Sequence, residues 1–144
     1  MKHLLSVIAL ILCTYVSFGQ TPVKVSEVPP AVLKSYHSAN SNGAKDSLWT
    51  KHVVSTYCVN YMDEGKPYQA WYMEDGSWIK TITEIPATQL SAEVHTQIAH
   101  MYPEYVVSKA LIELNSSGKF YTVDLVKGKD KATAHFLMSG KHVK

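Results

Sequence analysis

Histidine is the residue type in this chain best suited to binding a metal ion, and the sequence has seven histidines. His95 and His100 are five positions apart, about 140° around a helix, so their rings point away from a common ion. His135 and His142 flank a predicted turn and could approach each other, but no carboxylate or cysteine beside them completes a site. We therefore predict solvated histidines and no metal site.

Catalytic motifs are also missing from the sequence. It contains no nucleophile elbow, no zinc-protease helix and no glycine-rich phosphate loop. Glu74 and Asp75 are adjacent carboxylates, but neighbours on a strand point to opposite faces. Asp75 is moreover followed by Gly76, and Asp-Gly is a hairpin signal that uses the aspartate in the turn. We predict no catalytic residue, no cofactor and no enzyme activity.

The charge composition limits the kinds of partner. The 14 basic residues nearly balance the 12 acidic residues, and every basic residue is lysine. Arginine, whose planar fork grips phosphate or carboxylate with two hydrogen bonds, does not occur. A balanced charge without arginine argues against nucleic acid as a partner.

A binding surface is the remaining possibility, and its candidates come from the alternation of residues 56–73. Tyr57, Val59 and Tyr61 alternate with smaller or polar residues, so we expect the tyrosines to point into a core. The opposite, outward-facing side chains are then Thr56, Cys58, Asn60, Gln69, Trp71 and Met73.

Trp71 is the most informative of these outward positions. An exposed tryptophan close to Met73 on a sheet is typical of a binding hot spot. An alternative stays open, in which Trp71 covers a sheet edge or contacts its own loop. For Trp78, beside the Asp-Gly turn, we expect packing in the core or on that turn.

Two short helices are predicted to support the strands. Residues 26–37 begin with Ser26 as a possible N-cap, and Pro29 and Pro30 suit a first turn because amides there lack partners. Residues 90–103 begin with Ser91 as N-cap and end at Pro103. The predicted apolar stripes are Val32, Leu33 and Tyr36 on the first helix, and Val94, Ile98 and Met101 on the second.

The pattern of strands repeats along the chain. Strands are predicted at 57–61, 68–72 and 78–83, and again at 106–114, 121–126 and 132–138, followed by a stub at His142. A shift of 64 positions superposes Gly76 on Gly140, and a shift of 62 superposes the helices. We therefore predict a tandem repeat of a helix plus four antiparallel strands, with repeats at about 26–84 and 88–144.

These units predict an α+β fold. A helix of three turns cannot cover a four-stranded sheet, and neither unit is large enough to be stable alone. The expected solution is one roughly eight-stranded antiparallel sheet with both helices on one face. The other face is then open to water or to a partner.

The first 19 residues have the layout of a signal peptide. Lys2 precedes an apolar run from Leu4 to Val16, too short to span a membrane, and cleavage is expected between Gly19 and Gln20. Lipidation at Cys13 and an uncleaved anchor stay open as alternatives. We expect a periplasmic or secreted single domain, residues 20–144, with no membrane span. Its one cysteine, Cys58, then forms no internal disulfide and is expected to be buried.

Eight positions together resemble a known pattern: Trp49, Asp75, Gly76, Trp78, Pro86, Tyr102, Pro103 and Tyr105. At these positions the chain resembles the PepSY-like or beta-lactamase-inhibitor-protein-like proteins, which are small exported proteins of Gram-negative bacteria. The resemblance covers about residues 28–143 and implies a tandem helix-plus-sheet fold. It also implies binding or inhibition of a peptidase or other enzyme through an open sheet face.

Two functional hypotheses follow from the sequence and the resemblance. The first is a non-catalytic periplasmic binding module for a protein or peptide of the cell envelope, such as an inhibitor or modulator of a peptidase, acting through the open face around Trp71. The second is a carrier or sensor of a small ligand or envelope component, held between the sheet and the loop from Asn40 to Leu48.

Overall fold

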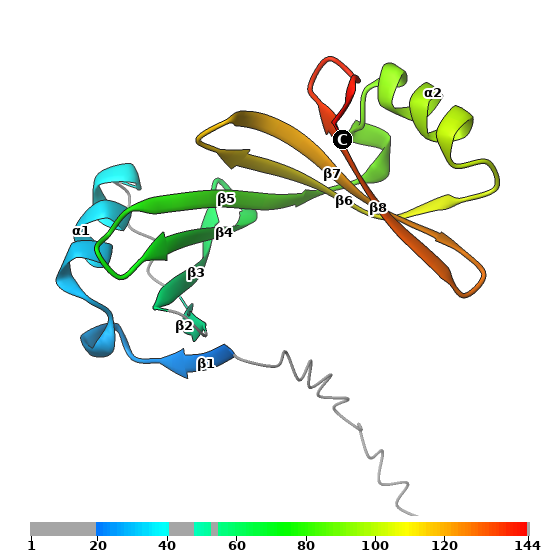
Figure 1. Ribbon diagram of the computed structural model, residues 1–144. Coiled ribbons are helices and arrows are strands. Elements are labelled where there is room, and N and C mark those ends of the chain that lie inside the picture. The colour runs from blue at the N-terminus through cyan, green and yellow to red at the C-terminus, as the bar shows by residue number, and fades with distance from the viewer. Residues whose placement is uncertain (1–19, 41–47, 53–54, 144) are drawn as a thin grey trace, which may run out of the picture.

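The computed structural model describes residues 20–40, 48–52 and 55–143 (Figure 1). The predicted signal peptide and its cleavage site at Gly19, and residues 41–47 of the loop proposed to hold a ligand, lie outside the described residues. The strands are β1 Gln20–Val23, β2 Leu48–His52, β3 Thr56–Asp63, β4 Lys66–Met73, β5 Trp78–Ile85, β6 Val106–Asn115, β7 Gly118–Lys127, β8 Asp130–Leu137 and β9 His142–Val143. The helices are α1 Pro30–Ala39 and α2 Ala92–Met101, with short 3-10 helices η1 Val25–Glu27 and η2 Ala87–Gln89.

The described strands form one open antiparallel sheet in which each strand pairs with the next along the chain. The predicted α+β class and single antiparallel sheet are therefore confirmed. The sheet has nine strands rather than about eight, because β1 adds an edge strand beside β2 through four residue pairs from Gln20–His52 to Val23–Trp49. This short segment has no alternation of apolar and polar residues from which a strand could be predicted.

Both α helices cover the same face of the sheet. Residues directly opposite each other on neighbouring strands share a face. One such row runs from β3 to β8 through Tyr61, Tyr68, Thr83, Ile112, Tyr121 and Phe136. Tyr61 belongs to the core under α1 and Phe136 to the core under α2, so the two helices lie on one side, as predicted.

The core is divided in two. Under α1, Val32 and Tyr36 pack on buried residues of β2, β3 and β4, including Trp49. Under α2, Val94 and Ile98 pack on buried residues of β6, β7 and β8. Figure 1 shows α1 at one end of the sheet and α2 at the other, with β5 and β6 joining the two halves. No residue of β5 is fully buried.

The helix starts were predicted with mixed success. Ser91 caps α2, because its hydroxyl accepts a hydrogen bond from the Val94 amide at 3.3 Å. Ser26 as the N-cap of α1 was wrong: it lies in η1, and α1 begins after Pro29, which provides no side-chain cap. The two prolines stop the helix from extending toward Ser26. Met101 was also misplaced in the α2 stripe, since its side chain is exposed at the last residue of the helix.

The element bounds recur at the predicted spacing. The two α helices have ten residues each and begin 62 positions apart, at Pro30 and Ala92. Strands β4 and β8 have eight residues each and begin 64 positions apart, at Lys66 and Asp130. The tandem repeat itself stays a prediction.

Candidate binding surface

The face of the sheet opposite the two α helices, here called the helix-free face, carries the candidate site. One row of cross-strand partners on it runs from β2 to β8 through Leu48, Asn60, Gln69, Ile82, Glu113, Phe120 and Leu137. A second row runs through Thr50, Cys58, Trp71, Lys80 and Asn115. Apolar, polar and charged side chains are therefore mixed over this face.

All six residues proposed from the sequence have the orientation expected of them. The pairs Thr56–Met73, Cys58–Trp71 and Asn60–Gln69 each join β3 to β4 on the helix-free face. Met73 is exposed, whereas Thr56, Asn60, Gln69 and Trp71 are half-buried.

Cys58 differs from the other five residues because its side chain is buried. It points to the helix-free face but is only 2 % exposed, because Thr50 and Trp71 flank it on the two neighbouring strands. Burial raises the pKa of the Cys58 thiol to about 12, against smaller opposing effects of the Thr50 hydrogen bond and the Lys80 charge. The expected burial of Cys58 is confirmed, and its place among contact residues must be corrected: it supports Trp71 from beneath the surface.

Trp71 is held by its neighbours. Its ring centroid lies 4.3 Å from that of His52, and the Lys80 ammonium lies 5.9 Å from the centroid of the Trp71 ring. The indole nitrogen of Trp71 is buried and has no hydrogen-bond partner among the described residues. Partial burial lowers the pKa of His52, which favours its neutral ring in this stack. Truncation of Trp71 would thus remove packing as well as any contact with a partner.

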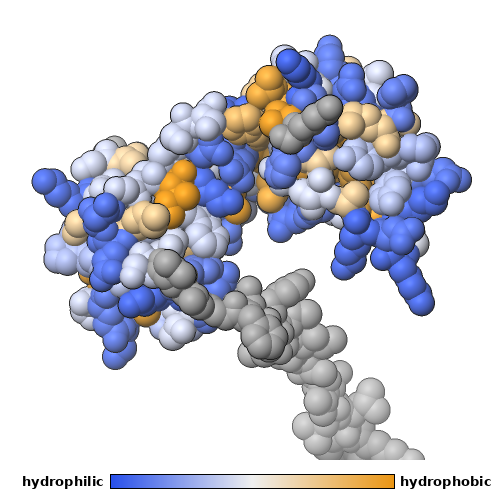
Figure 2. Space-filling view, viewed as in Figure 1, coloured by the Kyte–Doolittle hydropathy of each residue, from blue (hydrophilic) through white to orange (hydrophobic). Residues whose placement is uncertain are grey.

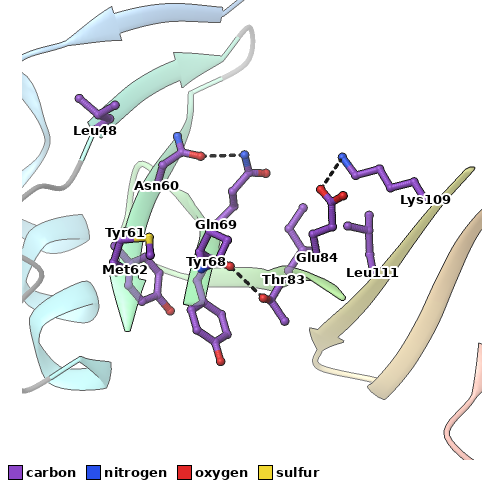
Figure 3. A pocket seen from close by; sticks show the side chains of 12 residues that line it. Leu48, Asn60, Tyr61, Met62, Tyr68, Gln69, Thr83, Glu84, Lys109 and Leu111 are labelled. Atoms are coloured by element: carbon purple, nitrogen blue, oxygen red, sulfur yellow. Dashed lines mark hydrogen bonds and ion pairs between the residues drawn. The ribbon is translucent and has the colours of Figure 1, made fainter. Parts of the chain in front are cut away.

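Asn60 and Gln69 lie in the wall of a pocket on the helix-free face (Figure 3). The Gln69 side-chain amide donates to the Asn60 side-chain oxygen at 2.7 Å, which fixes both amides. The pocket has a volume of about 310 Å³. Its lining on this face comprises Leu48, Asn60, Met62, Pro67, Gln69, Ile82, Glu84, Lys109 and Leu111.

The rim of this pocket is apolar at one end and charged at the other. Leu48 is 71 % exposed and Met62 is 54 % exposed, which is high for large apolar side chains. Across the sheet, the Lys109 ammonium lies 3.4 Å from the Glu84 carboxylate, as Figure 3 shows. A partner could therefore bury an apolar side chain at this pocket while its polar groups form hydrogen bonds with the charged end of the rim.

A second ion pair lies farther along the same face. Lys80 and Glu113 approach to 3.3 Å, and the Asn115 amide donates to the other Glu113 oxygen at 3.0 Å. Lys80 also lies near the Trp71 ring, so this network joins β4, β5 and β6. The sequence did not predict Leu48, Ile82 and Leu111 as pocket residues. The alternation of residues in β5 and β6 indicates which face Ile82 and Leu111 point to. The register that brings them beside Gln69 cannot be read from the sequence.

The remaining candidates have structural roles in the described chain. Asp75 forms the predicted turn, since its carboxylate accepts from the Ser77 amide at 2.8 Å, and this bond lowers the pKa of Asp75. Trp78 is 38 % exposed rather than part of the core, and its indole N–H donates to the Thr81 hydroxyl at 3.0 Å. It therefore packs locally at the turn, the second of the two expected arrangements.

The histidines of the described residues do not gather into a metal site. His135 is hydrogen-bonded to Thr122 at 3.0 Å, and the His142 ring packs against Phe136. In the described part of the chain, no cluster of three or more histidine, cysteine or acidic side chains is placed to hold a metal ion. Over the same residues, no helix is long and apolar enough to cross a membrane.

These features define a class of protein: a small α+β domain that leaves one face of an antiparallel sheet uncovered by its helices. Residues 55–142, more than half of the chain, match the model of a family provisionally described as beta-lactamase-inhibitor-like and PepSY-like. The chain belongs to this PepSY-like family. A comparison with curated proteins gives no match.

Solved structures share the fold. A DUF2874 family protein from Bacteroides ovatus superposes with a TM-score of 0.70 at 18 % identity, covering 81 % of this chain and 85 % of that one. A BLIP-like protein from Bacteroides fragilis superposes with a TM-score of 0.68 at 22 % identity, covering 79 % and 82 %. A third, from Bacteroides eggerthii and provisionally described as periplasmic, has a TM-score of 0.70 at 16 % identity over 81 % and 86 % of the chains. At these identities the likeness shows the fold alone.

Proposed function

We propose that this protein is an exported, non-catalytic binding module that captures a protein or peptide of the cell envelope on its helix-free face. The observation that carries the proposal is the pocket beside Asn60 and Gln69, with Leu48 71 % exposed at its rim. Leu48 and Met62 are large apolar side chains mostly in water, and a partner that covers them lowers the free energy of the system. Gln69, Asn60, Trp71, Met73 and Thr56 are the proposed contact residues, with Cys58 beneath them.

The family description supports this assignment. A beta-lactamase-inhibitor-like family implies recognition of another protein, and the B. fragilis neighbour carries the same likeness in its name. Inhibition of a peptidase or another envelope enzyme is the form of binding that the family suggests. The signal-peptide pattern of residues 1–19 and the periplasmic description of one structural neighbour support export to the periplasm.

The physical design of the pocket suits one anchoring side chain. A volume of about 310 Å³ is at the small end of ligand sites, so it accepts a single large side chain of a partner rather than a whole folded element. The Glu84–Lys109 pair at the rim is exposed and paired, so it adds orientation more than affinity. Affinity would come from burying Leu48, Met62 and Leu111.

The test is capture of partners from envelope extract by immobilised protein. Wild type is compared with Leu48→Glu, which places a charge on the helix-free face, and with Leu114→Glu, a matched control on the opposite face. We expect protein bands retained by wild type and Leu114→Glu and lost with Leu48→Glu, identified by mass spectrometry. Bands that persist with Leu48→Glu would exclude this face as the interface, and the absence of any retained band would argue against the proposed function.

A further inference from the structure

The helix side of the sheet carries a second hollow, between the two cores. Because α1 covers one end and α2 the other, the part of β5 and β6 around Thr81 and Leu114 belongs to neither core. Two cavities lie there, of about 520 and 280 Å³, and both include Thr81 and Leu114 in their walls. They form one groove, here called the inter-helix groove. Figure 2 shows a molecule of two lobes, with patches of apolar surface near the place where the lobes join.

The walls of the inter-helix groove are aromatic and aliphatic. Tyr61 and Tyr68 stack with ring centroids 5.5 Å apart and an angle of 20° between planes. Trp78 and Leu114 remain 38 % and 44 % exposed, so apolar surface faces water inside a concave site. The indole N–H of Trp78 is bound to Thr81, which holds the ring in place before any ligand arrives. Such a fixed aromatic wall binds flat or aliphatic groups with little loss of side-chain entropy.

The inter-helix groove also has polar side chains in its lining, including two threonines and two lysines. Thr81 and Thr83 lie on β5 and each uses its hydroxyl in one hydrogen bond, so each keeps capacity for another. Lys66 and Lys119 line the larger cavity. Lys66 lies across the β3–β4 turn from Asp63, whereas Lys119 lies opposite Leu114 on β6.

No carboxylate among the described lining residues neutralises these lysines. Glu84 borders the larger cavity, but its carboxylate pairs with Lys109 on the helix-free face. The inter-helix groove therefore combines apolar walls with positive charge at Lys119. This complementarity selects an anionic group attached to an apolar body.

We propose that the inter-helix groove binds a small amphipathic anion, with its apolar part against Trp78 and Leu114 and its negative group at Lys119. The combined volume of the two cavities lies in the usual range for sites that hold small molecules. The groove and the helix-free face lie on opposite sides of the sheet, so a small ligand and a protein partner do not compete for surface. This site is thus separate from the proposed protein interface.

The experiment uses 1-anilinonaphthalene-8-sulfonate, an aromatic sulfonate whose fluorescence rises in apolar sites, titrated into the native protein. We expect saturable binding by wild type. Leu114→Glu should weaken it roughly tenfold or more, because it removes apolar contact and adds a negative charge. Lys119→Gln should weaken it about two- to fivefold, the size of one exposed ion pair, and should make binding less sensitive to salt.

Leu48→Glu is the matched control on the helix-free face and should bind the probe like wild type. Far-UV circular dichroism and thermal unfolding check that Leu114→Glu is folded, and Lys119→Gln, a change at an exposed lysine, provides the test if it is not. The proposal is overturned if wild type does not bind, if Leu48→Glu weakens binding while Leu114→Glu does not, or if Lys119→Gln leaves affinity and salt dependence unchanged. Partner capture depends on Leu48 instead, so either idea can fail without the other.

Discussion

Gly76 lies so close to the first turn of α1 that a Cβ built on it would be 2.6 Å from the carbonyl oxygen of Ala31. Gly140 makes the corresponding approach to α2, against Glu93. Both glycines adopt left-handed φ values, +87° and +89°. In each half of the molecule, a hairpin turn thus packs against the helix of that half at a residue that has no side chain. The two contacts have the spacing of the predicted repeat.

Replacement of Gly76 by alanine tests this contact. A left-handed alanine costs about 1–2 kcal/mol by itself. The Ala31 contact adds a steric cost, so we expect Gly76→Ala to lower the free energy of unfolding by several kcal/mol in urea titration. Gly65→Ala is the matched control, because Gly65 has φ +76° with nothing within 4 Å of the added Cβ. Equal losses for the two variants would show that the turn does not press on α1.

The two helix starts give a second, smaller effect. Ser91→Ala removes the hydroxyl that accepts from the Val94 amide, and we expect a loss of about 1 kcal/mol of unfolding free energy. Ser26→Ala should be close to neutral, because Ser26 is exposed in η1 and does not cap α1. Thermal or urea unfolding of both variants measures the difference. A comparable loss at Ser26 would mean that η1 contributes to α1 in a way the contacts do not show.

The sequence predicted these helices and strands because their signals are local. Ser91 before an apolar stripe, Asp75-Gly76 between two alternating runs, and the prolines at 29 and 30 all act within a few residues. The misplaced cap at Ser26 has the same origin. Serine is a good N-cap, but the fixed φ of two prolines moves the N-cap three positions onward, to Pro29.

The candidate site was predictable only in part, because a pocket depends on the register between strands. Alternation placed Asn60 and Gln69 on the correct face. On β5, the cross-strand partner of Gln69 is Ile82. This pairing depends on a register shift between Trp71 and Tyr72, where β4 pairs with β5. No local pattern specifies such a bulge. The exposure of Leu48 and the burial of Cys58 depend likewise on what lies across from them.

The thiol of Cys58 should be unreactive in the folded protein. It is 2 % exposed, and burial raises its pKa to about 12. At pH 8 the thiol is therefore neither accessible to a reagent nor ionised to the reactive thiolate. In a chain that starts at Gln20, we expect no labelling by Ellman's reagent under native conditions and one thiol per chain in concentrated urea. Cys58→Ala provides the blank. Rapid labelling of native protein would show that Trp71 and Thr50 open readily.

Two buried tyrosines should make the fold sensitive to high pH. Burial raises the pKa of Tyr61 and of Tyr72 to about 12, from the ordinary value of 10.0. Between pH 10 and 12 the unfolded chain loses these phenolic protons while the folded chain keeps them, so the unfolded state is favoured increasingly as pH rises. We expect the free energy of unfolding to fall across this window, by at most about 1.4 kcal/mol per pH unit for each tyrosine.

Lysines titrate in the same pH range, so the contribution of one tyrosine has to be read by comparison. Tyr72→Phe keeps the ring in the core beneath α1 and removes the ionisable hydroxyl. Urea unfolding at several pH values from 9 to 12 should show a shallower decline for this variant than for wild type. The reason is that one group whose proton uptake differs between the two states is gone. Parallel declines would mean that the Tyr72 hydroxyl ionises as easily in the folded protein as in the unfolded chain, and that its burial in this core does not disfavour the phenolate.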